Sequence, residues 1–403
     1  MTLQRADRRP PALDSAELDA VIAEIAEDAR RRRAEGGGRP ERALELAREH
    51  LLGAVRIPAE AGGGGYSMRE FFTLAIRLAE ADPDVPHILR GHFGTVEEAW
   101  RARDTERGQL WLRRVLAGKI FGGAQAELSG QPGVYTYDTT LVADGENFRL
   151  NGRKFYSTGS SYADYLRISA NNEEGRQVSV VVPADRPGIL HAGDWDGIGQ
   201  RETGSGTTVL DDVLVYPDEV GEFRRIAEPG KPRSPQAHLL LHAIGAGVLR
   251  ALTAETADLL RRRTRSYSWG NTELAREDPQ LLAVIGSLAS TTFVVEAAVL
   301  TAADALDRAY RHVWEHGRAD DALERAASLE TSKVKVAVEK IALQAAAEAF
   351  DAGGASWTRA SVQLDRHWRN LRTLFSHNPT VYKARVVGDV VVNDAPLPGV
   401  GFF

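Results

Sequence analysis

The chain has 403 residues, so it is long enough for two or three domains, because a single hydrophobic core stops growing at about 250 to 300 residues. Hydrophobic residues make up 43% and charged residues 26%, which is ordinary for a globular protein and argues against a membrane protein. The absence of cysteine excludes disulfides, thiolate nucleophiles and cysteine-ligated metals, and a net charge of -6 argues against a dedicated nucleic-acid binder.

Apolar residues recur at helical spacing between residues 15 and 117, as in Leu18, Val21 and Ile25, and predict a helical first region. The segment 57–66 contains a proline and four consecutive glycines, a composition typical of a turn. Ser67 directly follows this segment, so we expect it to cap the next helix.

The basic residues near the N-terminus are interpreted without a binding role. The run from Arg30 to Arg33 fits the solvated end of a helix, because no aromatic residues are interleaved with it. Residues 1–14 contain arginines and a Pro-Pro pair but no apolar core, so they do not resemble a secretion signal. A cytoplasmic location is therefore expected.

Short β-rich runs appear between residues 121 and 220 and predict a separate β-domain. The predicted strands cover residues 139–142, 148–150, 166–170 and 178–182. The predicted turns between strands are Asp144-Gly145, Asn151-Gly152 and Glu174-Gly175.

Helical periodicity returns after Pro235 in segments long enough for a helical bundle. The longest of these cover residues 239–263, 279–310 and 322–352. The proline-rich segment 228–235 is the expected link between the β-domain and this bundle.

A series of segments, in order along the chain, resembles the acyl-CoA dehydrogenase superfamily from about residue 15 to the end. This resemblance implies an α+β fold with an N-terminal α-helical domain, a central antiparallel β-barrel domain and a C-terminal four-helix bundle. The implied domains are residues 1–118, 119–228 and 229–403. The segments that carry the resemblance are 57–65, 150–159, 195–205, and 353–356 followed by Arg369.

The stretch from Arg366 to Gly388 points to one branch of that superfamily. Acyl-CoA dehydrogenases keep a proton-abstracting glutamate in about this region, but here the stretch contains no Asp or Glu and carries His377. Removing the α-proton of an acyl thioester needs a strong base, so the resemblance implies that the flavin is used for oxygen chemistry instead.

Further features are similar to the oxygenase branch, which includes dibenzothiophene monooxygenases, sulfone monooxygenases and flavin-dependent amine N-hydroxylases. The similar segments are 91–93, 264–269 with 277–279, 365–373 and 376–379.

Other positions depart from this branch. Gly123 replaces an amide residue and Ala126 a hydroxyl residue, Asn378 replaces a signature Asp, and Ser356 replaces a phosphate-binding Arg.

The resemblance implies catalytic roles for His92, Ser157 and His377, as hydrogen-bonding groups around the N5 and C4a atoms of the flavin. Histidine suits this role because its pKa of about 6.5 lets modest shifts select either protonation state near neutrality.

The resemblance also implies a set of cofactor-binding residues and no metal site. Two aromatic residues would flank the flavin ring, arginines and a Gly-Ser pair would bind its phosphate or ring edge, and two glycines would allow close backbone approach. These residues are Phe155, Trp195, Arg265, Arg369, Gly204, Ser205, Gly353 and Gly354.

The expected function is that of a two-component flavin-dependent monooxygenase. Reduced flavin, either FMNH2 or FADH2, and O2 would oxygenate a small organic substrate at N, S or aromatic C through a C4a-hydroperoxyflavin. No glycine-rich motif lies in the strand-to-helix context of a nicotinamide site, so we expect a separate NAD(P)H:flavin reductase as partner. The resemblance further implies a homotetramer that completes each flavin site across subunits; no nucleic-acid or membrane partner is expected.

Two other functions stay open at this point. One is an acyl-CoA dehydrogenase or oxidase whose base lies elsewhere, for example on another helix of the bundle. The other is a non-catalytic ligand-binding protein that keeps the flavin fold without its chemistry, which the departures between Gly122 and Glu127 make a real alternative.

Overall fold

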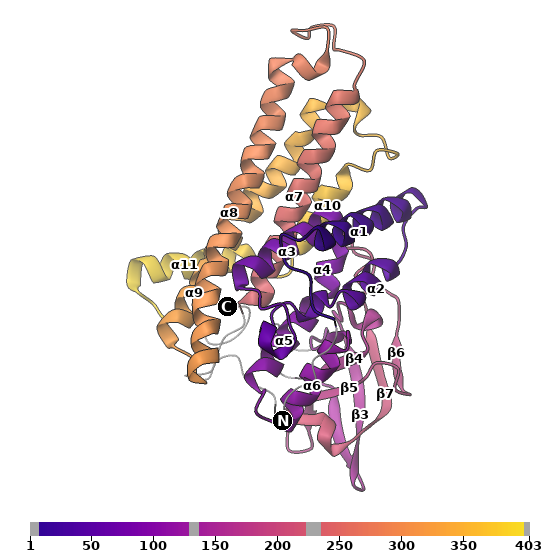
Figure 1. The fold of residues 1–403 in the computed structure, drawn as a ribbon, viewed down its shortest axis with the longest axis vertical. Coiled ribbons are helices and arrows are strands. Elements are labelled where there is room, and N and C mark those ends of the chain that lie inside the picture. Colours follow the sequence, from indigo (N-terminus) through magenta and orange to yellow (C-terminus); the bar gives the residue numbers. More distant parts are fainter. Residues whose placement is uncertain (1–7, 129–136, 223–234, 399–403) are drawn as a thin grey trace.

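The structure, a computed structural model, describes residues 8–128, 137–222 and 235–398 and contains three consecutive regions (Figure 1). The first is helical, the second is a β-sheet and the third is again helical. The expected link at residues 228–235, and with it the second predicted domain boundary, lies outside the described residues except for Pro235.

The first region packs its helices around an apolar core that includes Leu18, Phe71 and Phe72. Ser67 caps helix α3 as predicted: its Oγ accepts from Glu70 N at 3.2 Å, while a Glu70 carboxylate oxygen accepts from Ser67 N at 2.7 Å. The helices are α1 (Ala16–Ala34), α2 (Glu41–Glu49), α3 (Met68–Ala81), α4 (Asp84–Ile88), α5 (Arg90–Arg101) and α6 (Glu106–Leu116).

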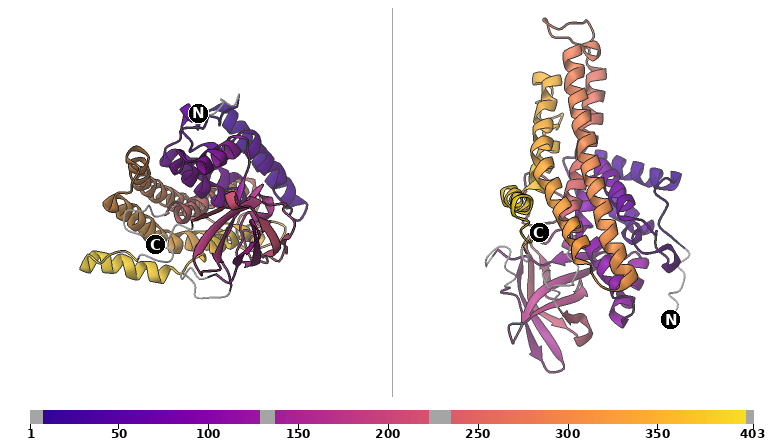
Figure 2. Two further views of the ribbon diagram at one scale, coloured as in Figure 1. Left: turned by 90° about the horizontal axis from the view of Figure 1, so that it is seen from below. Right: turned by 90° about the vertical axis from the view of Figure 1, so that its left-hand side faces the viewer.

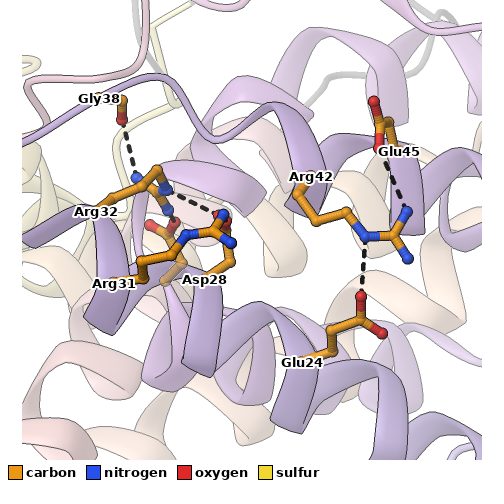
Figure 3. A network of polar contacts seen from close by, with 8 residues as sticks. Glu24, Asp28, Arg31, Arg32, Gly38, Arg42 and Glu45 are labelled. Atoms are coloured by element: carbon orange, nitrogen blue, oxygen red, sulfur yellow. Dashed lines mark hydrogen bonds and ion pairs between the residues drawn. The ribbon is translucent and has the colours of Figure 1, made fainter.

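Two arginines of the run at the end of α1, Arg31 and Arg32, are paired with Asp28 of the same helix, as Figure 3 shows. Asp28 accepts from Arg31 Nη2 at 2.5 Å and from Arg32 Nε at 2.8 Å, and Arg32 also pairs with Asp82. Arg32 Nη1 donates to the carbonyl of Gly38 at 3.0 Å, which fixes the chain just after the helix. This set of contacts supports the interpretation of the run as a helix end.

The second region forms one sheet with the strand order β6-β7-β3-β2-β4-β5-β8, and β1 pairs with β4. Most pairs are antiparallel, as expected, but β1 and β2 both run parallel to β4. Its core is separate from the helical core. The strands are β1 (Phe121–Ala124), β2 (Thr140–Asp144), β3 (Asn147–Lys154), β4 (Tyr165–Asn172), β5 (Gln177–Pro183), β6 (Ile189–His191), β7 (Thr208–Val215) and β8 (Val220–Glu222).

The predicted turn at Asn151-Gly152 is wrong, because β3 continues through both residues. The register against β7 shifts between Leu150 and Gly152, so this pair forms an irregularity inside the strand rather than its end. Gly152 has φ +157 and a Cβ there would lie 2.3 Å from Thr139 Oγ1, which explains why glycine is needed without a turn.

The third region is a helical bundle built around α7, which also packs against α3 and so joins the two helical regions into one core. The loop between α7 and α8 forms the tip of a long hairpin that projects away from the sheet (Figures 1 and 2). The helices are α7 (Gln236–Arg262), α8 (Pro279–His316), α9 (Asp321–Glu348), α10 (Asp365–Phe375) and α11 (Thr380–Asn393).

Two of these helices are long and apolar enough to cross a membrane by length and composition alone. In α7, 67% of the apolar window is buried inside the protein, as expected of a core helix. In α8 only 22% of the window is buried, and Phe293 and Val294 are 73% and 51% exposed. The described residues of one chain therefore leave the apolar face of α8 uncovered, and the cytoplasmic location stays a prediction.

Candidate active site

The candidate site lies where the three regions meet. The loop between β6 and β7 binds helix α10 through two hydrogen bonds, from Gln200 N to Asn370 Oδ1 at 2.8 Å and from Arg369 Nη1 to Ile198 O at 3.0 Å. The same loop reaches the first region, where the Gln200 side chain lies 2.8 Å from His87 Nδ1. One loop thus connects the sheet, the bundle and the segment between α3 and α5.

His377 follows α10 directly and lies at this junction. Its Nε2 is 3.1 Å from Arg90 Nη1 at the start of α5. A guanidinium only donates, so Nε2 must accept and the ring proton must be on Nδ1. Burial, followed by the charge of Arg90, holds the pKa of His377 well below its usual value, so the imidazole is neutral at physiological pH.

His92 also lies on α5 but points away from His377, because residues two apart on a helix differ by about 200° in direction. Its Nδ1 accepts from Phe121 N at 3.2 Å, so Nε2 carries the proton and donates to Gly53 O at 3.2 Å. Burial lowers the pKa of His92 to about 4. Both ring nitrogens are occupied by backbone groups, so the geometry favours a structural role instead of the predicted catalytic one.

Ser157 is 1% exposed, and its hydroxyl has no hydrogen-bond partner in the described part of the chain. On β1, a Cβ added to Gly123 would meet no atom within 4 Å, so the amide side chain missing at this position leaves open space. An unpartnered buried hydroxyl and room beside the backbone both suit a bound planar ring, so these residues fit a flavin.

Phe155 and Trp195 lie on neighbouring loops of the sheet and are connected through Tyr156. The Tyr156 ring centroid is 4.2 Å from that of Phe155 and 6.0 Å from that of Trp195. Trp195 Nε1 donates to Gln200 O at 2.8 Å, which fixes the indole within the loop that contacts α10. The aromatic residues predicted to flank the flavin are therefore close to each other and to the junction.

Ser205 is buried, and its hydroxyl belongs to a short chain of hydrogen bonds. Thr203 donates to Gln200 O at 2.8 Å, so Ser205 must donate to Thr203 at 2.7 Å and accept from Thr158 at 2.8 Å. The Ser205 proton is thus used inside the loop. Gly204, with φ +59, is the residue that lets the loop pass close to the 155–161 segment.

Arg369 is held by the fold on two sides, since besides its bond to Ile198 O its Nε donates to Asp365 at 2.9 Å. Arg265, Gly353 and Gly354 lie elsewhere in the subunit. Arg265 is exposed in the loop at the tip of the α7–α8 hairpin, and neighbouring Arg263 donates to Ala352 O at 2.9 Å, which places both glycines near the same tip. Within one chain these three residues, near the hairpin tip, are therefore separated from the other predicted cofactor residues at the junction (Figure 1).

The sequence interpretation missed Arg90, His87 and Gln200, three polar residues at the junction. Arg90 is the α5 residue that contacts His377, and it stands directly before the segment Gly91-His92-Phe93 that drew attention to His92. A single arginine after the segment 85–89, which is apolar except for His87, was the available signal, because an unexplained charge in an apolar setting is uncommon.

Comparison with known families agrees with this architecture. Residues 126–213 match the middle domain of acyl-CoA dehydrogenases, and residues 239–381 match the C-terminal domain, together more than half of the chain.

Similar proteins are named as monooxygenases. A dibenzothiophene monooxygenase of Mycolicibacterium goodii is 28% identical, over 90% of both chains. The probable FMNH2-dependent monooxygenase SfnC of Pseudomonas putida is 27% identical, over 97% of both chains. The crystal structure of FMN-bound TdsC from Paenibacillus sp. A11-2 has a TM-score of 0.84 at 27% identity, covering 96% of this chain and 99% of TdsC. The chain therefore belongs to the acyl-CoA dehydrogenase superfamily, within its branch of flavin-dependent monooxygenases.

Proposed function

We propose that this chain is the oxygenase component of a two-component flavin monooxygenase. Reduced flavin supplies two electrons, and O2 supplies one oxygen atom to a small organic substrate while the other leaves as water. The observation that carries the proposal is His377, a neutral imidazole held by Arg90 in the region where dehydrogenases keep a carboxylate base. A neutral imidazole is too weak a base for an acyl thioester α-proton, but it is a good hydrogen-bond donor.

We propose FMN as the flavin, because SfnC is named as FMNH2-dependent and TdsC has been crystallised with FMN. The ring would lie between Phe155, Trp195 and the space beside Gly123, with the hydroxyl of Ser157 at its edge. The backbone around Gly204 and Ser205, with Arg369, would border the rest of the cofactor.

His377 would act through Nδ1, which carries the ring proton while Nε2 accepts from Arg90. From this atom a proton can be shared with the oxygen that is transferred to the substrate. Arg90 keeps the tautomer fixed and the ring neutral, so it positions His377. Packing of the β6–β7 loop on α10 closes the junction and helps to exclude water, which would otherwise release the oxygen as hydrogen peroxide.

We further propose a homotetramer in which the hairpin tip of one subunit completes the flavin site of another. Arg265, Gly353 and Gly354 are separated from the junction within one chain, yet the resemblance assigns them to the same cofactor. The uncovered apolar face of α8 supports association, because exposed apolar patches of this kind mark contact surfaces. In this tetramer, Arg265→Ala should weaken FMN binding without changing the light-scattering mass.

A dehydrogenase with a displaced base would need a basic carboxylate on another helix of the bundle. Glu255 on α7 is such a candidate, and its surroundings disfavour this alternative. Burial raises its pKa, but hydrogen bonds from His367, at 2.9 Å, and from Arg366 outweigh that effect and lower the pKa to about 2. A carboxylate this acidic, with its oxygen already occupied, is a poor base. Acyl-CoA thioesters should therefore fail to bleach bound oxidised FMN under anaerobic conditions in stopped-flow absorbance; bleaching at catalytic rates would support the dehydrogenase.

The direct test of the two-component function is reductase dependence. Protein with FMN alone should not consume NAD(P)H, whereas addition of an NAD(P)H:flavin reductase should start O2 consumption that the protein diverts from peroxide to product. The screen should contain indole, amines and organosulfur compounds, since an indole complex of TdsC is known. Rapid NAD(P)H oxidation without reductase would contradict the proposal, and failure to bind any flavin would favour the non-catalytic alternative.

A further inference from the structure

Arg90 has an unusual environment for a partly buried arginine. Its side-chain contact within the described residues is with the neutral ring of His377, and none of the ion pairs in that part of the chain includes it. Burial lowers the pKa of Arg90 to about 10, so the guanidinium remains protonated at neutral pH. A full positive charge is therefore kept at the junction, and no carboxylate of residues 8–128, 137–222 or 235–398 pairs with it.

The other basic groups around His377 add to this charge and do not balance it. The electrostatic effects on the pKa of His377 come from Arg90, His238, His87 and Lys335, all of which are basic. Lys335 lies at the end of α10, where its Nζ donates to Phe375 O at 2.7 Å and is 3.3 Å from Glu339. The Glu339 carboxylate also binds Arg372 and Thr380, so it is already used by its own neighbours.

A second, independent observation is an unused donor at the same place. Gln200 is fully buried, and its Oε1 is 2.8 Å from His87 Nδ1, but its Nε2 has no hydrogen-bond partner among the residues that the structure describes. A buried amide N–H without an acceptor is costly, so its presence calls for an acceptor that binds there. His87 lies on α4, three residues before Arg90 at the start of α5, so its hydrogen bond to Gln200 brings this donor into the neighbourhood of Arg90.

We propose that Arg90 and Gln200 bind an oxyanion of the substrate, such as a carboxylate, sulfinate or sulfonate, and hold the substrate beside His377. This inference rests on the proposed function and assigns its substrate class: small organic acids in preference to neutral compounds. A guanidinium offers paired donors that match the two oxygens of such a group, and the amide offers a third. Among the charged groups around His377, Arg90 has the largest electrostatic effect on its pKa.

Titration calorimetry of the FMN-loaded, full-length protein tests this directly with three matched probes: benzoate, benzenesulfinate and neutral benzamide. The acids should bind at least about 10-fold more tightly than benzamide, as expected for one charge-assisted contact. Arg90→Met should abolish this preference, and Arg90→Lys should retain part of it. Arg101→Met is the control, because Arg101 is also partly buried, lies at the other end of α5 and contacts Tyr310 only through its ring.

Equal binding of acids and benzamide, or a preference that survives in Arg90→Met, would overturn the assignment. A preference that is present in flavin-free protein but absent in FMN-saturated protein would also overturn it, because the acids would be occupying the flavin phosphate site. Weaker reduced-FMN binding in Arg90→Met, without any change in the acid preference, would assign the charge to the cofactor instead. Reductase-dependent O2 consumption is measured separately on the parent protein, where none of these outcomes bears on it, so the proposed function and this inference fail separately.

Discussion

Two of the charged side chains of helix α5, Glu97 and Arg90, have different surroundings. Near its end, Glu97 is 1% exposed and faces Arg56, which is 4% exposed, with 2.7 Å between Glu97 Oε1 and Arg56 Nε. At its first residue, Arg90 faces a neutral histidine and no carboxylate among the described residues. A buried charge is costly unless it is paired, so the first contact serves the fold, whereas the second charge fits a ligand.

The two histidines His92 and His377 differ in the same way. His92 has both nitrogens fixed by backbone groups, and His377 presents one nitrogen to Arg90 and keeps its proton on the other. Burial alone does not separate the two roles, since burial is the largest cause of the lowered pKa in both. The hydrogen-bond partners separate the two roles. A histidine with both nitrogens bound to backbone groups has a structural role, whereas a histidine held by a charge without a counterion is available for chemistry.

The largest expected effect is on stability, at the paired end of α5. Glu97→Ala leaves Arg56 buried without its partner and should lower the free energy of unfolding by about 3 to 5 kcal/mol, measured by urea denaturation. The double variant Arg56→Met, Glu97→Leu removes both charges and should recover most of the loss. If the single variant were as stable as the parent, the pair would not be holding the fold.

The next effect is on chemistry, at the unpaired end. In His377→Phe, reduced flavin should still bind and react with O2, but substrate oxygenation should fall by at least about 10²-fold while peroxide release rises, because the proton donor is lost. The product-to-peroxide ratio and the melting temperature are both measured. An unchanged ratio, or activity lost only in step with the melting temperature, would make His377 structural.

A smaller effect concerns pH and His92. Its folded-state pKa of about 4 lies below the unfolded value of about 6.5, so the unfolded chain takes up the proton first as pH falls. Its contribution to stability is present above pH 6.5 and is lost at about 1.4 kcal/mol per pH unit on further acidification. His92→Asn should flatten the fall in unfolding free energy between pH 6.5 and 5. An equally steep fall in the variant would assign the acid sensitivity to other groups.

The smallest expected effect is the change in stability on removal of Arg90, and it distinguishes Arg90 from the paired Arg56. Arg90→Met should change the unfolding free energy by no more than about 1 kcal/mol, and toward greater stability, because it removes a charge that has no counterion. A loss as large as that of Glu97→Ala would show that Arg90 holds the fold, and the contrast between the two ends of α5 would disappear.

Much of the fold could be predicted from the sequence, because helical periodicity and turn residues act locally. The long apolar periods gave α7, α8 and α9, and Ser67 marked the start of α3. The prediction of a turn at Asn151-Gly152 was wrong. The dipeptide that favours a tight turn also fits a β-bulge when another residue, here Thr139, lies close to the glycine. Which of the two forms is decided by tertiary contacts.

The site was less predictable, because it depends on directions that spacing alone does not give. His92 and Arg90 are two residues apart, and the turn of the helix decides which of them faces His377. Arg265 shows a second limit of sequence-based prediction. From the hairpin tip it could contact flavin only in the proposed oligomer, and the sequence of one chain does not show how subunits are arranged.

The central claim is that this site transfers oxygen from O2, and one isotope experiment tests it most directly. Protein loaded with chemically reduced FMN is mixed with ¹⁸O2 and a panel of aromatic, amine and organosulfur acids, without reductase, for a single turnover. The account predicts one ¹⁸O atom in the product of at least one acid, and loss of that product in His377→Phe. Full reoxidation of the flavin with stoichiometric peroxide, and no ¹⁸O in any compound, would contradict it.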